Sequence, residues 1–279
     1  MKNLLISFSG GRTSAFMSRY LQLNDLYKNH KKYFIFMNTS KEKEETLEFV
    51  NECDKRFKLN VIYLEAIINP VLGQGNDFKI TDFKNLKRKG EIFEDGIKKY
   101  GIPNVLHKWC SRVLKKEVFD RFTKKHNLLN ENSLKAIGVR YDEKQRLSYF
   151  DKNLFYPLAD EIQATKSFIN NWWRNQDFNL NLKEYEGNCD LCYKKSERKL
   201  LTIIKENPFI ADWWHEMEEK YSYSEEHEKS FYFYRNNTST KELIEKAKNF
   251  SNFAKDEKFH QITLQDYILD SELSCLCGA

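Results

Sequence analysis

The sequence of 279 residues has no long apolar run, and this absence excludes one large class of proteins. No stretch approaches the roughly 20 apolar residues that a membrane-spanning helix needs, so we expect no membrane partner. The first residues, Met1-Lys2-Asn3, are expected to lead into a short strand, and we expect no signal peptide there. Internal repeats and low-complexity segments are also missing. We therefore expect a cytoplasmic protein.

A strong excess of one charge is missing as well. Lysine and arginine number 46 against 41 acidic residues, which leaves a formal net charge of +5. This charge suits anionic ligands but does not demand nucleic acid. Basic clusters at Lys84–Lys89 and at Lys194, Lys195, Arg198 and Lys199 are typical of a solvated face. The hydrophobic share of 41 % is enough for a sizeable core.

Strand and helix patterns alternate through the first half of the chain. Short apolar strands are expected at 3–8, 33–37, 60–64 and 134–139, with a further extended piece at 153–158; helices are expected at 15–27, 46–57 and 110–126. Glycines punctuate 69–105, which we interpret as a long loop or lid. The alternation predicts an α/β fold with a doubly wound parallel sheet. We expect a nucleotide-binding domain over 1–160, with a helical, cysteine-containing region over 161–279 packed on it.

A glycine-rich turn follows the first expected strand and opens the first helix. Such a turn lets backbone N–H groups converge on a phosphate, and the helix N-terminus adds a favourable dipole. It is neither a Walker A loop nor a dinucleotide fingerprint. It resembles the pyrophosphate loop, Ser-Gly-Gly-x-Asp-Ser, of the adenine-nucleotide α-hydrolases and phosphoadenosine phosphosulfate (PAPS) reductases. The residues concerned are Ser7, Ser9, Gly10, Gly11, Arg12, Thr13 and Ser14, with Thr13 where that family usually has Asp.

Two further segments resemble elements of the same family. Asn38-Thr39-Ser40 through Glu45-Thr46 is similar to its Asp-Thr-Gly-x-x-x-x-Glu-Thr element beside the adenosine, although helix capping alone also explains the pattern. Gly138-Val139-Arg140 through Arg146 is similar to its Gly-x-Arg-x-x-Glu-x-x-Arg segment. Arg140 and Arg146 suit phosphate because guanidinium groups pair with its oxygens. A surface turn with ion pairs is the alternative.

A fourth segment, Trp109-Cys110-Ser111-Arg112 through Lys115, resembles the family's Cys-x-x-x-Leu-Lys element. Arg112 and Lys115 would lie one turn apart near a helix start, where they suit phosphate or sulfate. Cys110 stands at that helix N-terminus, which lowers a thiol pKa. A buried, inert cysteine is the alternative.

The cysteines are concentrated toward the end of the chain. Cys189 and Cys192 form a Cys-x-x-Cys pair within Gly-Asn-Cys-x-x-Cys, and Cys275 and Cys277 lie near the last residue, whereas Cys53 falls on a predicted core face. In a cytosolic chain this spacing favours metal, cluster or redox chemistry over disulfides. Cys110, Cys189, Cys192 and Cys277 are candidate ligands of a [4Fe–4S] cluster or Zn²⁺. The alternative for the tail is a frayed end with unused thiols.

Taken in this order, the segments resemble the PAPS reductase-like branch of the pyrophosphate-loop superfamily, phage and mobile-element type. The resemblance implies the HUP-type fold of that superfamily, an adenine nucleotide (ATP or PAPS) and Mg²⁺. It implies cleavage of ATP at the α-phosphate with adenylation of, or sulfur transfer to, a nucleic-acid or small-molecule acceptor. Lys115 and Arg140 would then be catalytic. A sulfonucleotide reductase with Cys275 or Cys277 as nucleophile is the first alternative, and a non-catalytic nucleotide-sensing module is the second. A homodimer stays open.

Overall fold

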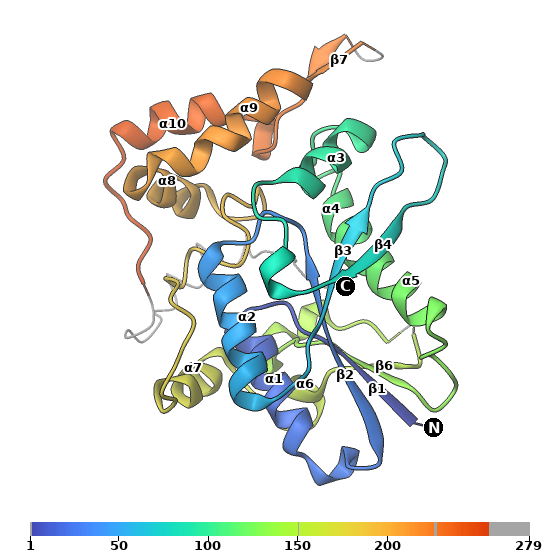
Figure 1. Ribbon diagram of the computed structural model, residues 1–279. Helices are drawn as coiled ribbons and strands as arrows, with labels where there is room; N and C mark the ends of the chain where they lie inside the picture. Colours follow the sequence, from blue (N-terminus) through green and yellow to red (C-terminus); the bar gives the residue numbers. More distant parts are fainter. Residues whose placement is uncertain (1, 150, 226–227, 257–279) are drawn as a thin grey trace.

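The computed structural model describes residues 2–149, 151–225 and 228–256, and its centre is a six-stranded sheet (Figure 1). The strands lie in the order β4-β3-β2-β1-β5-β6, and neighbours are parallel except for β4, which is antiparallel to β3. The bounds are β1 Lys2–Ser7, β2 His30–Asn38, β3 Ile62–Ile67, β4 Asp77–Thr81, β5 Leu134–Ala136 and β6 Leu154–Phe155. The predicted α/β fold with a mostly parallel sheet is confirmed.

Helices follow the strands and then form most of the C-terminal region. Their bounds are α1 Arg12–Leu23, α2 Glu44–Phe57, α3 Glu91–Tyr100, α4 Trp109–Ser111, α5 Glu117–Lys125, α6 Pro157–Asp160, α7 Lys166–Arg174, α8 Glu197–Glu206, α9 Asp212–Tyr221 and α10 Thr240–Lys248. A π-helical turn, Arg112–Lys116, joins α4 to α5, and a small hairpin pairs β7 (Tyr223–Ser224) with β8 (Lys229–Ser230). None of the helices within the described ranges has both the length and the apolar character needed to cross a membrane.

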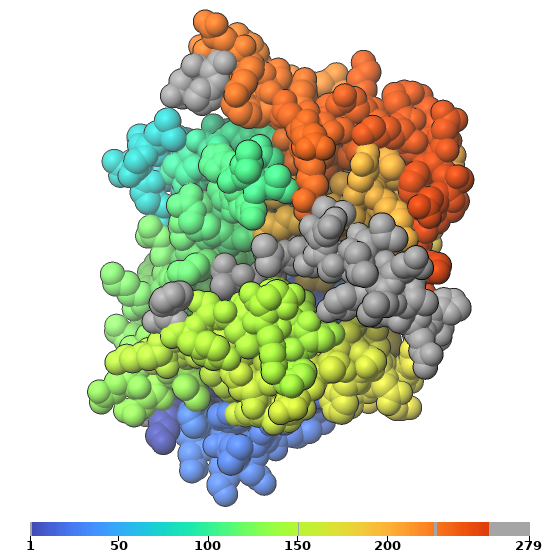
Figure 2. Space-filling model, turned by 180° about the vertical axis from the view of Figure 1, so that it is seen from behind, coloured from blue at the N-terminus to red at the C-terminus, as the bar shows by residue number. Residues whose placement is uncertain are grey.

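Each face of the sheet has its own hydrophobic core, because successive side chains of a strand point to opposite faces. Leu4 and Ile6 of β1 pack in one core with residues of α1, α2 and α7. Leu5 packs in the other core with residues of α3, α5, α8, α9 and α10. In Figure 2, the C-terminal residues (orange to red) gather at one end of the molecule and N-terminal residues (blue) at the other.

Helix α7 completes the first core from the C-terminal side of the sequence. Trp173 is fully buried and donates a hydrogen bond from Nε1 to the carbonyl of Arg12 (2.9 Å). Its ring meets Phe49 of α2 edge to face, with 4.9 Å between centroids, and Phe178 packs beside it at 5.4 Å. Cys53 of α2 is buried in the same core, as predicted from its helical spacing.

The expectation of an irregular segment over 69–105 is wrong in two places, where the chain forms β4 and α3. Helix α3 contains Gly96, which normally weakens a helix. Here the absence of a side chain is required, since a Cβ on Gly96 would lie 2.3 Å from the Trp109 ring. The glycine that suggested a loop therefore lets Trp109, only 1 % exposed, pack against the helix.

Glu218 of α9 makes stability depend on pH. Its carboxylate is 3 % exposed and accepts hydrogen bonds from the backbone N–H groups of Phe233 (3.2 Å) and Thr240 (2.6 Å). Burial outweighs these bonds and raises the pKa of Glu218 to about 7. The folded state thus binds a proton that the unfolded state has released above its ordinary pKa of 4.5. The stability that this proton supplies is present in full below that value and is lost as the pH rises through about 7.

We expect the contribution of Glu218 to the free energy of unfolding to fall by about 3 kcal/mol between about pH 4.5 and pH 7. Glu218→Gln removes this titration, so its stability relative to the natural chain should increase with pH. Urea denaturation of both proteins at about pH 5 and about pH 8 measures the change. An equal difference at both pH values would contradict the assignment.

Candidate functional site

The turn between β1 and α1 is held in shape by one of its serines, Ser9, and by Ser14 in the first turn of α1. The backbone N–H and the hydroxyl of Ser9 both lie within hydrogen-bond distance of Ser14 Oγ, at 3.2 and 3.0 Å. Ser14 Oγ in turn donates to the Gly11 carbonyl (3.0 Å). Gly10 has φ +83°, a conformation that residues with a side chain rarely adopt. These hydrogen bonds therefore tie the predicted glycine-rich turn to the start of α1.

Gly10→Ala should lower the free energy of unfolding by about 2–4 kcal/mol. The new Cβ would lie 2.7 Å from Thr46 Cγ2, and the positive φ would add strain. Gly73→Ala is a matched control, because Gly73 also has a positive φ (+78°) but no described atom within 4 Å of the Cβ position. Urea denaturation should show the larger loss for Gly10→Ala; equal losses would mean that the packing against α2 does not matter.

The N-terminus of α1 is open to an anion. Gly11 is its N-cap, and within the described structure the cap makes no side-chain hydrogen bond and the first turn holds no acidic residue. Gly11, Arg12, Thr13 and Ser14 all line a cavity of about 590 Å³. Backbone N–H groups without intrahelical partners, next to the positive end of the helix dipole, favour a phosphate or sulfate at this position.

The cavity lies where the order of the strands reverses. From β1 the chain moves to β2 and β3 on one side, and later to β5 and β6 on the other. Ser7 at the end of β1, Ser9 after it, and Ile137 and Gly138 after β5 line the cavity together. In open α/β sheets, ligands bind at the carboxyl ends of the strands at this reversal point. Gly138 lies against the start of α1, since a Cβ on it would be in ordinary van der Waals contact with the Cα of Ser14, at 3.5 Å.

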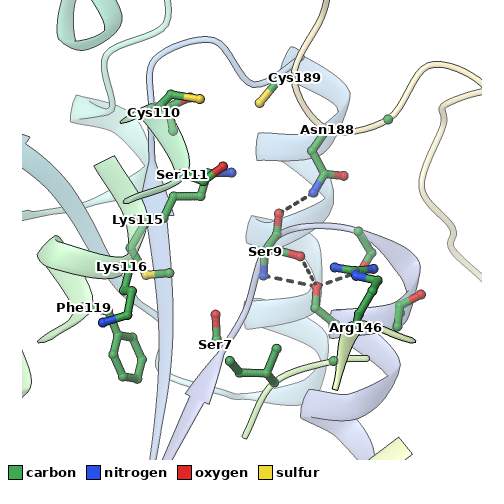
Figure 3. A pocket seen from close by; sticks show the side chains of 18 of the residues that line it. Ser7, Ser9, Cys110, Ser111, Lys115, Lys116, Phe119, Arg146, Asn188 and Cys189 are labelled. Carbon is green, nitrogen blue, oxygen red and sulfur yellow. Dashed lines mark hydrogen bonds between the residues drawn. The ribbon is translucent and has the colours of Figure 1, made fainter. Parts of the chain in front are cut away.

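Basic side chains outnumber carboxylates among the described residues that line the cavity. One wall comes from α4, the π-helical turn and α5, and the opposite wall from the turn after β1 and the segment 187–195 (Figure 3). The π-helical turn brings both Lys115 and Lys116 to the first wall. The basic residues are Arg12, Lys115, Lys116, Lys135, Arg140, Arg146, Lys194 and Lys195, and the carboxylates are Asp120, Glu143 and Asp151.

Arg140 and Arg146 both line the cavity, next to the turn at α1. Arg140 Nε lies 2.8 Å from Asp142 Oδ1, and Arg146 NH1 lies 2.6 Å from Glu143 Oε1. Their side chains are 19 % and 13 % exposed, so the carboxylates hold the guanidinium groups in place. The ion-paired turn is therefore observed, and the binding of phosphate by the same two residues stays a prediction.

The structure does not bring the other two predicted arginines to the cavity in the same way. The Arg12 guanidinium is bound by Asn179 Oδ1 (2.8 Å), Glu184 Oε1 (3.0 Å) and the Leu180 carbonyl (2.6 Å), so it anchors α1 to the segment 179–184. Arg112 is 60 % exposed, lies 3.8 Å from Glu117, and is not among the described residues that line the cavity. Sequence spacing places a residue on a helix but does not fix the direction of a long side chain.

Residues at the end of β2 and after it support the turn that follows β1. Thr39 lines the cavity, whereas Asn38 is fully buried and donates from Nδ2 to Glu65 Oε1 (2.6 Å) and the Lys87 carbonyl (2.8 Å). Thr46 is buried against Gly10. Neither Asn38, Thr46 nor the partly exposed Glu45 is among the described lining residues. Asn38 and Thr46 thus contribute to the shape of the site rather than to its surface.

Cys110, Cys189 and Cys192 all line the cavity, and their assignment as ligands of one centre stays a prediction. The sulfurs of Cys110 and Cys189 point toward one another from opposite walls (Figure 3). Cys110 Sγ lies 3.2 Å from the Tyr193 hydroxyl, and burial raises the pKa of its thiol, so the expected lowering by a helix N-terminus is not seen. Burial likewise raises the pKa of Cys189 to about 12, against the opposing effect of Lys115.

A complete metal centre is not found in the part of the chain that the structure describes. There, no group of three or more His, Cys, Asp or Glu side chains is placed so that it could hold a metal ion. Cys275 and Cys277 lie outside the described residues, so the predicted fourth ligand does too. The described thiols alone therefore do not fit a cluster or a zinc ion.

Several residues of the site had no role assigned from the sequence. Glu42, with 1 % of its side chain exposed, accepts from Thr39 N and Oγ1 (both 2.8 Å) and lies 3.5 Å from Lys115 Nζ. Lys194 and Lys195 are buried, which corrects the expectation of a solvated face for these two. Lys194 Nζ donates to Ser111 Oγ (2.9 Å) and Lys195 Nζ to the Asp190 carbonyl (2.8 Å).

Comparison with known proteins gives one extensive match. The chain is 34 % identical over 205 residues to the uncharacterized nin region protein ORF290 of Escherichia phage lambda, which covers 72 % of this chain and 69 % of that protein. The chain belongs to the ORF290 family.

A more distant member of the comparison is the uncharacterized protein MJ0066 of Methanocaldococcus jannaschii, 27 % identical over 139 residues. That match covers 50 % of this chain and 23 % of the archaeal protein. No family model matches the chain, and no solved structure matches it. The match to ORF290 supports the predicted phage type, and the chemistry of the family has to be argued from the site itself.

Proposed function

We propose that this ORF290-family protein is an adenine-nucleotide-binding enzyme of the pyrophosphate-loop type, similar to PAPS reductases. One observation carries the proposal: the Ser9–Ser14 turn, Arg140 and Arg146 line a single cavity at the reversal point of the sheet. A polyphosphate bound there would meet the N-terminus of α1 and two guanidinium groups at once. The cavity volume of about 590 Å³ lies within the range of small-molecule sites.

The proposed reaction is cleavage of ATP between its α- and β-phosphates. An oxygen of the acceptor attacks the α-phosphorus, the bond from that phosphorus to the bridging oxygen breaks, and pyrophosphate leaves with the electron pair. The turn would hold the leaving phosphates, while Arg140 and Lys115 offset the charge that develops during the transfer. Mg²⁺ would enter with the nucleotide phosphates and screen their charge. The acceptor is a nucleic acid or a small molecule.

A second candidate, reduction of a sulfonucleotide such as PAPS, is favoured by the three thiols of the cavity. One thiol attacks the sulfur, a sulfur–sulfur bond forms, and the sulfur–oxygen bond to the nucleotide phosphate breaks. A second thiol then displaces sulfite, so two thiols are oxidised to a disulfide for each sulfite released. Cys275 or Cys277 would be the nucleophile, and Cys110, Cys189 and Cys192, which line the cavity, would serve as resolving thiols.

Product analysis of the full chain separates the candidates. Pyrophosphate release from ATP with Mg²⁺ would support the first, and sulfite release from PAPS with a dithiol reductant the second. Nucleotide binding by calorimetry without either product would favour a nucleotide-sensing module. Failure to bind ATP and PAPS would overturn the proposal as a whole.

Metal analysis of protein purified without oxygen tests the cysteine-ligated centre separately. Iron with acid-labile sulfide would support a [4Fe–4S] site held by Cys110, Cys189, Cys192 and Cys277. Zinc without sulfide would indicate a zinc site. Absence of both would leave the thiols available for the reductase chemistry.

A further inference from the structure

The segment that carries Cys189 is joined to the loop after β2 by backbone contacts. Glu42 and Cys189 form an antiparallel bridge. The Lys43 N–H donates to the Asn188 carbonyl (2.8 Å), and the Asp190 N–H donates to the Lys41 carbonyl (3.2 Å). The Cys189 backbone is therefore held on both sides of the thiol, and a displacement of this segment would change the surroundings of its sulfur.

The side chain of Asn188 extends from this segment to the turn after β1. Its Nδ2 donates to the Ser9 carbonyl at 2.7 Å (Figure 3). Its Oδ1 lies 3.3 Å from the position that a Cβ on Gly11 would occupy. Asn188 also lines the cavity. One residue thus contacts the turn that would bind phosphates and is covalently next to a cavity thiol.

The hydrogen bond from Asn188 holds the carbonyl of the Ser9–Gly10 peptide. The Ser9 N–H and hydroxyl are already directed at Ser14 Oγ. The Ser9 carbonyl belongs to the peptide that leads into Gly10 at φ +83°, and glycine permits this peptide to rotate easily. Asn188 therefore sets the orientation of the Ser9–Gly10 peptide, and a ligand that moves this peptide also moves Asn188.

We propose that Asn188 is a positioning residue that couples occupancy of the Ser9–Ser14 turn to the reactivity of the Cys189 thiol. The proposal deepens the proposed function and rests on it for the identity of the ligand, an adenine nucleotide bound through its phosphates. Bound phosphates hold the turn, the turn holds Asn188, and Asn188 holds the adjacent cysteine near Glu42, whose Oε1 is 4.0 Å from Cys189 Sγ. When no nucleotide is bound, the turn, Asn188 and Cys189 are held less firmly, so the Cys189 thiol reacts faster.

The test is the rate at which N-ethylmaleimide alkylates Cys189 in the full chain, resolved by peptide mass spectrometry, with and without ATP. Asn188→Ala removes the contact, and Asn188→Asp keeps the shape but cannot donate to the Ser9 carbonyl. Asn179→Ala is the matched control, because Asn179 anchors α1 through Arg12 but is not among the described lining residues. Thermal melting shows which variants are folded.

We expect ATP to slow alkylation of Cys189 about fivefold to tenfold in the natural chain and in Asn179→Ala, and to have no effect in either Asn188 variant. Without ATP, both Asn188 variants should be alkylated faster than the natural chain. Retention of the ATP effect, or an unchanged rate without ATP, in a folded Asn188 variant overturns the proposal. If the natural chain binds neither ATP nor PAPS, the proposed function fails, and the nucleotide-free rates still decide whether Asn188 positions Cys189.

Discussion

Arg140→Ala is expected to lower the rate of pyrophosphate release from ATP by a factor of about 10²–10³. Arg140 lines the cavity beside the turn at α1, and its guanidinium is held in place by Asp142. A donor fixed in this way loses little freedom when a phosphate binds, so its removal should affect the transition state more than the folded state. Initial rates over a range of ATP concentrations measure the loss.

Arg112→Ala is the matched control for this result. The sequence predicts Arg112, one turn from Lys115 near a helix start, as a ligand of phosphate or sulfate, but its side chain is 60 % exposed and lies near Glu117. Its removal should change the rate by less than about threefold. Equal losses in both variants would show that the cavity at the reversal point is not where the nucleotide reacts.

Asn38→Asp is expected to reduce the free energy of unfolding by about 3–5 kcal/mol. Asn38 is fully buried, and its Nδ2 lies 2.6 Å from Oε1 of Glu65, whose side chain is also fully buried. Aspartate at this position would place its carboxylate at hydrogen-bond distance from the carboxylate of Glu65. It would also remove the donor to the Lys87 carbonyl. Guanidinium denaturation measures the loss.

Glu65→Gln in the Asn38→Asp background provides the test of cause. Exchange of the acid and the amide restores one carboxylate and one amide donor, so the double variant should recover part of the lost stability. If the double variant is as unstable as the sum of the two single variants, the repulsion between the carboxylates is not the reason for the loss.

The same pair shows why a sequence motif predicts part of this site and not all of it. The resemblance leads one to expect Asp where Asn38 stands, and nothing in the local sequence indicates that Glu65, from the neighbouring strand, supplies the carboxylate. The alternation of strands and helices and the Ser9–Ser14 turn can be predicted from apolar periodicity and glycine spacing, which are local features of the sequence. The pairing of β2 with β3 brings the carboxylate of Glu65 next to Asn38, and this contact between distant parts of the chain is not visible in the local sequence.

Side-chain direction and helix packing limit the rest. Arg12 and Arg112 stand in the predicted motifs, but the Arg12 guanidinium binds Asn179, 167 residues away, and Arg112 is largely exposed near Glu117. Gly96 suggests a loop until Trp109 is seen to occupy the space of its missing side chain. Asn188 lies in the Gly-Asn-Cys-x-x-Cys segment, but that segment does not predict its contact with Ser9, 179 residues away.

The packing of α7 on α2 has a consequence for synthesis on the ribosome. The apolar face of α2, with Phe49 and Phe57, is covered by Trp172, Trp173 and Phe178, more than 100 residues later in the chain. A nascent chain whose first strands and α2 have left the ribosome therefore exposes an aromatic surface until α7 emerges. Holding chaperones would be needed during this interval, and fragments that end before α7 should accumulate in inclusion bodies.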